Sequence, residues 1–110
     1  MSKPNPRQEH VSRMAREVAV AIRGRLRGTS PDTSVSHRSE GRMHVWRFRT
    51  GPSESERYLR VAHAAMARGD NAGQLLKQLD REQWEERLFA RPTESLVLSE
   101  AGRLKRYRQR

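Results

Sequence analysis

The side chains whose number and spacing suggest chemistry in this sequence are arginines. The stretch 103–110, RLKRYRQR, carries five positive charges, one aromatic ring and no carboxylate. Guanidinium groups bind phosphate oxygens through paired hydrogen bonds, and neutralising each phosphate of a nucleic acid releases counterions. The cluster therefore indicates phosphate contact. A solvated tail and contact with an acidic protein surface are the alternatives.

A second set of arginines lies on a predicted N-terminal helix. At 100° per residue, Arg16, Arg23 and Arg27 fall within about 40° of one another, beside the apolar stripe of this helix rather than opposite it. Arg13 lies close to them on the same helical wheel. We expect these four side chains to form one row of phosphate contacts.

A third set lies in RMHVWRFRT, residues 42–50, which alternates in the manner of a strand. Trp46 and Phe48 share one face of this strand, and Arg47 and Arg49 share the other. An open aromatic face would resemble a platform on which unpaired bases stack. The chain holds only six aromatic residues, so we expect these two rings to belong to the core and the two arginines to face solvent.

Other catalytic and ligand-binding patterns are missing from the sequence. The histidines His10, His37, His44 and His63 have no i, i+4 spacing, and there is no cysteine to bind zinc or act as a nucleophile. No nucleophile elbow and no glycine-rich phosphate loop is present. Glu85 and Glu86 are predicted to be solvated charges on a helix. We therefore expect a non-enzymatic protein without a cofactor or metal.

Charge is concentrated at the two ends of the chain. The 110 residues carry a net charge of +10, of which residues 1–49 contribute +7, residues 50–102 contribute −2 and the last eight residues +5. An excess of this size predicts polyanionic partners. No apolar run approaches the ~20 residues of a membrane span, and the first ten residues are polar. We expect a cytoplasmic protein with no membrane partner.

Apolar periodicity and turn residues predict the elements that position these side chains. A helix is predicted over 8–27 and a strand over 42–50, with TSVSH (33–37) as a candidate hairpin partner. Ser53 and Glu56 form a capping box that predicts a helix over 54–68. Asn71 and Gln74 predict another helix, which breaks at Asp80 and continues over 81–90. A β-hairpin is predicted over 95–107.

These elements predict a single α+β domain over 8–107, between a flexible tail (1–7) and a basic C-terminal tail (108–110). Three to four helices would pack on a small antiparallel sheet in the order helix-strand-helix-helix-strand-strand. This order resembles the winged-helix arrangement, and AMARGDNAGQL resembles a helix-turn-helix core at Ala65, Gly69 and Leu75. The resemblance implies that the second helix of that unit reads a DNA groove. Residues 71–90, however, carry more carboxylates than cations.

Taken together, the patterns predict a small nucleic-acid-binding protein that contacts phosphates with little sequence preference. An accessory subunit of a nucleoprotein assembly is one form of this hypothesis. The alternative is a protein-interaction module that binds an acidic partner or a second copy of the chain. The residues predicted to contact DNA or RNA are Arg13, Arg16, Arg23, Arg27, Arg47, Arg49, Arg103, Lys105, Arg106, Arg108 and Arg110.

Overall fold

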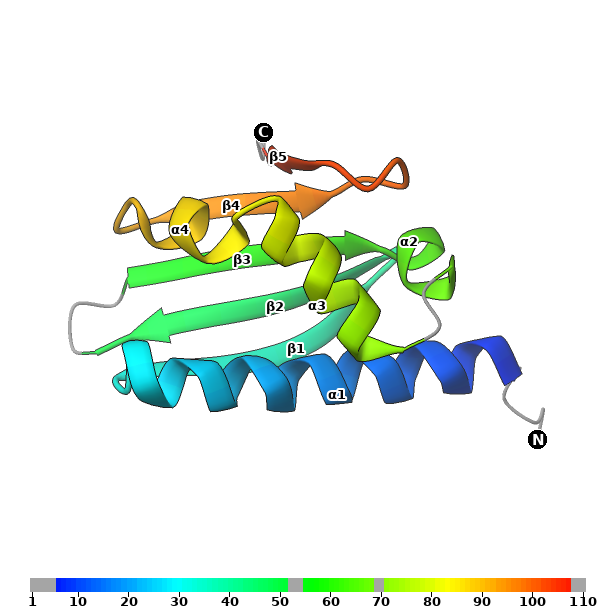
Figure 1. Ribbon diagram of the computed structural model, residues 1–110, viewed down its shortest axis with the longest axis horizontal. Helices are drawn as coiled ribbons and strands as arrows, with labels where there is room; N and C mark the ends of the chain where they lie inside the picture. Colours follow the sequence, from blue (N-terminus) through cyan, green and yellow to red (C-terminus); the bar gives the residue numbers. More distant parts are fainter. Residues whose placement is uncertain (1–5, 52–54, 69–70, 108–110) are drawn as a thin grey trace.

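A long N-terminal helix is followed by three strands, three short helices and two further strands (Figure 1). The computed structural model describes residues 6–51, 55–68 and 71–107. The elements are α1 (Pro6–Thr29), β1 (Thr33–Glu40), β2 (Met43–Thr50), β3 (Ser55–Ala62), α2 (His63–Arg68), α3 (Ala72–Arg81), α4 (Trp84–Phe89), β4 (Glu94–Leu98) and β5 (Leu104–Arg106).

The five strands form one mixed sheet whose spatial order equals their order in the chain. Strands β1, β2 and β3 form an antiparallel meander, β3 and β4 are parallel, and β5 is antiparallel to β4. A parallel pair requires a crossover connection rather than a tight turn. The helices α2, α3 and α4 make up that crossover.

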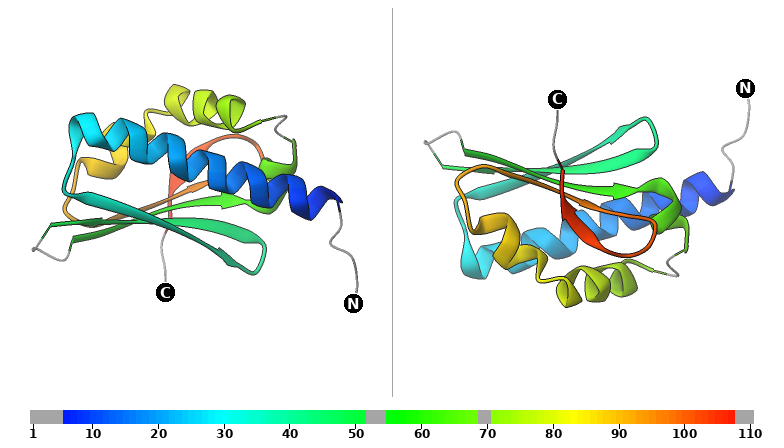
Figure 2. Two further views of the ribbon diagram at one scale, coloured as in Figure 1. Left: turned by 90° about the horizontal axis from the view of Figure 1, so that it is seen from below. Right: turned by 90° about the horizontal axis from the view of Figure 1, so that it is seen from above.

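Helices cover one face of the sheet, and no helix among the described residues covers the other. Figure 2 shows α1, α3 and α4 on the same side of the strands. Trp46 and Phe48 point to that side and are fully buried, as expected for core residues. The apolar stripe of α1 packs on the same core through Val11, Met14, Ala15, Val18, Ala19, Ile22 and Leu26.

The predicted element order is wrong. Residues 55–62, predicted to be helical, form β3, and only His63–Arg68 of that segment is a helix. The apolar residues of the segment fit both periods, but Leu59 and Val61 alternate into the core while β3 pairs with β2 over all eight residues. This tertiary pairing outweighs the local helical pattern. The predicted capping serine, Ser53, lies outside the described residues.

The resemblance to a winged helix is therefore wrong as well. TSVSH belongs to the eight-residue strand β1, which pairs with all of β2, so three consecutive strands separate α1 from α2. The first helix of the proposed motif, α2, has only six residues, and Gly69 lies outside the described residues. The C-terminal hairpin, by contrast, is confirmed as β4 and β5.

The predicted break between the last two helices is confirmed. The Asn71 side chain accepts a hydrogen bond from the backbone N–H of Gln74, 2.9 Å away, and so caps α3. Gln83 adopts the left-handed conformation, with φ 57°, and separates α3 from α4. Arg25 of α1 holds this corner through hydrogen bonds of 2.6 and 2.8 Å to the two carboxylate oxygens of Asp80.

We expect Gln83→Gly to raise the free energy of unfolding by up to about 1 kcal/mol, because glycine adopts positive φ without the steric cost that other residues incur. The matched change Lys77→Gly, within α3, should lower it by about 1 kcal/mol. Urea unfolding monitored by circular dichroism measures both. A lower free energy of unfolding for Gln83→Gly would contradict the claim that the left-handed conformation of Gln83 is strained.

Candidate nucleic-acid interface

The uncovered face of the sheet presents side chains in rows that run across the strands. Residues directly opposite one another on paired strands share a face. One row contains Arg38, Val45, Arg60, Val97 and Lys105. The next row contains Ser36, Arg47, Tyr58 and Ser95, with Tyr107 beside Ser95 through a 2.7 Å backbone hydrogen bond from the Tyr107 N–H. We call this surface the open face.

Arg60 lies at the centre of the open face between two tyrosines. Its guanidinium carbon is 4.3 Å from the centroid of the Tyr107 ring and 5.1 Å from that of Tyr58. Arg60 is only 4% exposed and also donates a hydrogen bond to the Ser95 hydroxyl. Among the described residues, no carboxylate lies within ion-pair distance of it. The buried cation is therefore stabilised by aromatic faces rather than by a counter-charge.

Positive charge exceeds negative charge on the open face. Its described cations are Arg38, Arg47, Arg49, Arg60 and Lys105, and its described carboxylates are Glu40 and Glu56. Glu40 pairs with Arg38, and Glu56 lies 3.4 Å from Arg49. Arg47 has a buried Nε atom with no hydrogen-bond partner. A buried donor without a partner costs about 1–3 kcal/mol, and a ligand acceptor could reach this atom only if the Arg47 side chain moved.

The Tyr58 ring is oriented by a hydrogen bond along its own strand. Its hydroxyl donates to a Glu56 carboxylate oxygen 2.5 Å away. This hydrogen bond raises the pKa of Tyr58 and lowers the pKa of Glu56. Tyr58 therefore remains a neutral hydrogen-bond donor at neutral pH, and its ring is held beside Arg60.

The predicted arginines of α1 lie on the helix-covered side of the molecule, away from the open face. Arg23 donates to the backbone carbonyl of Val35 at 2.9 Å, so it attaches α1 to the edge strand β1. Arg27 lies next to Arg23 along the same seam between α1 and β1. Arg13 and Arg16 line a separate hollow near the N-terminal part of α1.

The predicted C-terminal cluster is divided by the fold. Lys105 belongs to the open face, whereas Arg106 points to the other side and pairs with Glu94 at 3.3 Å. Arg103 lies exposed in the turn between β4 and β5. Arg108 and Arg110 lie outside the described residues. The described members of the cluster therefore do not share one surface of the protein.

Comparisons with models of protein families, with curated proteins and with solved structures found no match. Among the described residues, no helix is long and apolar enough to cross a bilayer. The function of the chain is therefore inferred from its own geometry and charge.

A chain of three imidazoles lies at the opposite side of the sheet from the open face. His37 Nε2 lies 3.0 Å from His44 Nδ1, and His44 Nε2 lies 3.3 Å from His63 Nδ1. The two-residue turn at Gly41, with φ 58°, brings β1 and β2 together, and the His63 backbone N–H donates to the Arg42 carbonyl. Three segments separated in sequence thus place these rings in one stack.

Sequence reasoning missed Arg38, Tyr58, Arg60 and the histidine chain. Alternation along 55–62 places Tyr58 and Arg60 on one face, but the capping box at Ser53 and Glu56 predicts a helix there instead. The three histidines lie on β1, β2 and α2, and no sequence spacing relates them. Only the register of β1 against β2 brings His37 within reach of His44.

Burial of His44 predicts a loss of stability in mild acid. The side chain is 6% exposed, and burial together with His37 and His63 lowers its pKa to about 4. The unfolded chain therefore binds a proton at higher pH than the folded chain, and stability falls as pH drops below about 6.5. We expect the free energy of unfolding to fall by about 2 kcal/mol between pH 7.5 and pH 5.

Urea unfolding at the two pH values measures this change, and His44→Gln removes the titrating group. The variant should lose most of the dependence on pH in this range, whatever its stability at pH 7.5. An equal dependence in both proteins would show that His44 does not control it.

Proposed function

We propose that the protein binds single-stranded nucleic acid across the open face, as a non-enzymatic protein with little sequence preference. The observation that carries this proposal is the uncovered, cationic face in which two tyrosine rings flank a buried arginine. Cationic side chains contact phosphates without reading sequence, and aromatic rings stack on any base.

The spacing of the cations supports a ligand that crosses the strands. Arg38, Arg60 and Lys105 lie in one row on β1, β3 and β5. Neighbouring strands are about 4.8 Å apart, so this row extends over about 19 Å. Arg38 and Lys105 are exposed, so a phosphate chain laid across the sheet would meet a cation at each edge strand and pass over the buried Arg60 between them.

The ring arrangement favours an unpaired strand over a duplex. Tyr58 and Tyr107 are half-buried, and both rings lie against the Arg60 guanidinium. Bases that are splayed out of a duplex stack on such rings, whereas paired bases are already stacked on one another.

The open face fits a protein partner less well. Among the described residues, the exposed large hydrophobic side chain is Val20 on α1, which is not on this face. Stable protein interfaces usually bury an apolar centre with aromatic anchors. On the open face the central Val45 is already fully buried by the protein's own side chains.

Fluorescence anisotropy with labelled single-stranded RNA, single-stranded DNA and duplex DNA, from ~50 to 200 mM salt, tests the proposal. The double variant Arg47→Gln/Lys105→Gln should bind single strands more weakly, with a salt slope smaller by about 1.4. The control Lys77→Gln/Arg81→Gln removes the same charge from α3 and should bind like the unchanged protein.

Equal losses in the two double variants would mean that net charge, not the open face, determines binding. No binding of any nucleic acid at low salt would contradict the proposed function. In that case a partner protein with an acidic surface becomes the better explanation.

A further inference from the structure

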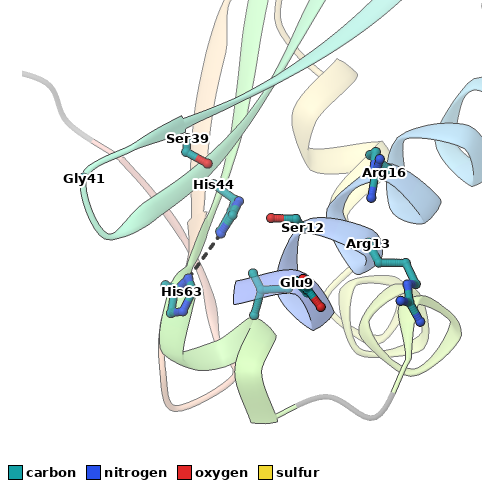
Figure 3. A pocket seen from close by; sticks show the side chains of 9 residues that line it. Glu9, Ser12, Arg13, Arg16, Ser39, Gly41, His44 and His63 are labelled. Atoms are coloured by element: carbon teal, nitrogen blue, oxygen red, sulfur yellow. Dashed lines mark hydrogen bonds between the residues drawn. The ribbon is translucent and has the colours of Figure 1, made fainter. Parts of the chain in front are cut away.

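A second polar site lies on the helix-covered side, between α1 and the β1–β2 hairpin. It is an open cavity of about 670 Å³. Figure 3 shows that Ser12 projects from α1 towards the ring of His44, while His63 lies below that ring and Ser39 above it. Arg16 follows Ser12 by four residues and so lies on the same face of α1.

The lining of this cavity consists mainly of hydrogen-bond donors. Ser12 and Ser39 supply hydroxyls and Arg16 a guanidinium, and all three residues are exposed. Val11 forms an apolar part of the wall. Glu9 is the carboxylate among the lining residues, and none of the described ion pairs involves Arg16. Such a set of donors fits an anion with several acceptor oxygens.

The three histidines supply one further hydrogen-bond donor or acceptor at His63. Which of the two it is depends on the direction of the hydrogen bonds between the imidazoles. Both ring nitrogens of His44 are engaged by other imidazoles, so the ring nitrogens outside these two hydrogen bonds are Nδ1 of His37 and Nε2 of His63, and of these two residues His63 lines the cavity. A neutral imidazole carries one N–H, and the chain therefore has two arrangements of its protons. In one arrangement His37 donates to His44, His44 donates to His63, and His63 Nε2–H is a donor. In the other, every hydrogen bond is reversed and His63 Nε2 is an acceptor.

A metal ion fits this arrangement less well than an anion does. The imidazoles bind one another instead of converging on a point, and the described residues contain no group of three histidine, cysteine, aspartate or glutamate side chains suited to a metal. Burial keeps His44 neutral at neutral pH, so the chain does not require a permanent counter-charge.

We infer that this cavity binds a tetrahedral oxyanion, such as a phosphate monoester, through Ser12, Arg16 and Nε2–H of His63. Binding selects the arrangement in which His63 donates, and His37 and His44 hold that arrangement through their hydrogen bonds. This site is on the other side of the sheet from the open face, and the inference does not depend on nucleic-acid binding.

Titration of the full chain with inorganic phosphate at constant ionic strength, followed by ¹⁵N NMR of the imidazole nitrogens at about pH 8, tests the inference. We expect saturable shifts at His63, with Nε2 becoming the protonated nitrogen and Nδ1 the unprotonated one. Ribose 5-phosphate distinguishes a phosphate monoester from free phosphate, and tighter binding of either one identifies the source of the oxyanion.

Two variants and a control separate this site from general anion binding. Arg16→Gln should weaken phosphate binding about tenfold, because a charge-assisted hydrogen bond is lost. His63→Gln should weaken it as well, while Arg81→Gln, an exposed arginine of α3 outside the cavity, should not. Shifts of the same size with chloride, or equal weakening by Arg16→Gln and Arg81→Gln, would overturn the inference.

Discussion

Burial of Trp46 and Phe48 against the helices determines which side chains the sheet exposes. Because side chains alternate along a strand, fixing these rings in the core forces Arg47 and Arg49 to the other face. The pairing of β2 with both β1 and β3 extends this constraint across the meander. Arg38 and Arg60 then face outward with Arg47, on a side that no described helix covers. The cationic surface is thus a consequence of how the core is filled.

Elements with one dominant pattern could be predicted from the sequence, and elements with two competing patterns could not. The stripe of α1, the cap of α3 and the C-terminal hairpin each had a single periodicity or capping signal. Residues 55–62 did not, because arginine stems at Arg57 and Arg60 occupy buried positions that a polarity pattern assigns to solvent. Arg57 is accommodated there by a 2.9 Å hydrogen bond to the Arg91 carbonyl and by the Phe89 ring. Such compensation depends on tertiary contacts and has no local signature.

The candidate sites follow the same rule: residues whose position depends on one strand could be predicted, and those whose position depends on several segments could not. Alternation within one strand predicts that Arg47 and Arg49 face solvent, and the structure places both on the open face, with Arg49 exposed and Arg47 half-buried. The contribution of Arg60, and its position between Tyr58 and Tyr107, depends on the parallel pairing of β3 with β4 and on the hairpin to β5. The histidine chain depends on three segments at once. The two faces differ in character, since the open face is an extended surface of rows and the cavity near α1 is a local cluster of donors.

The central claim is that nucleic acid binds to the open face rather than to the helices. Backbone amide NMR of the ¹⁵N-labelled full chain, titrated with an unlabelled single-stranded oligonucleotide, tests this claim most directly. The account predicts saturable shifts concentrated in β2, β3 and β5, with Arg47, Tyr58 and Lys105 among the most affected residues. Small shifts should occur in α3 and α4. Shifts concentrated on α1, α3 or α4, with the strands unaffected, would contradict the account.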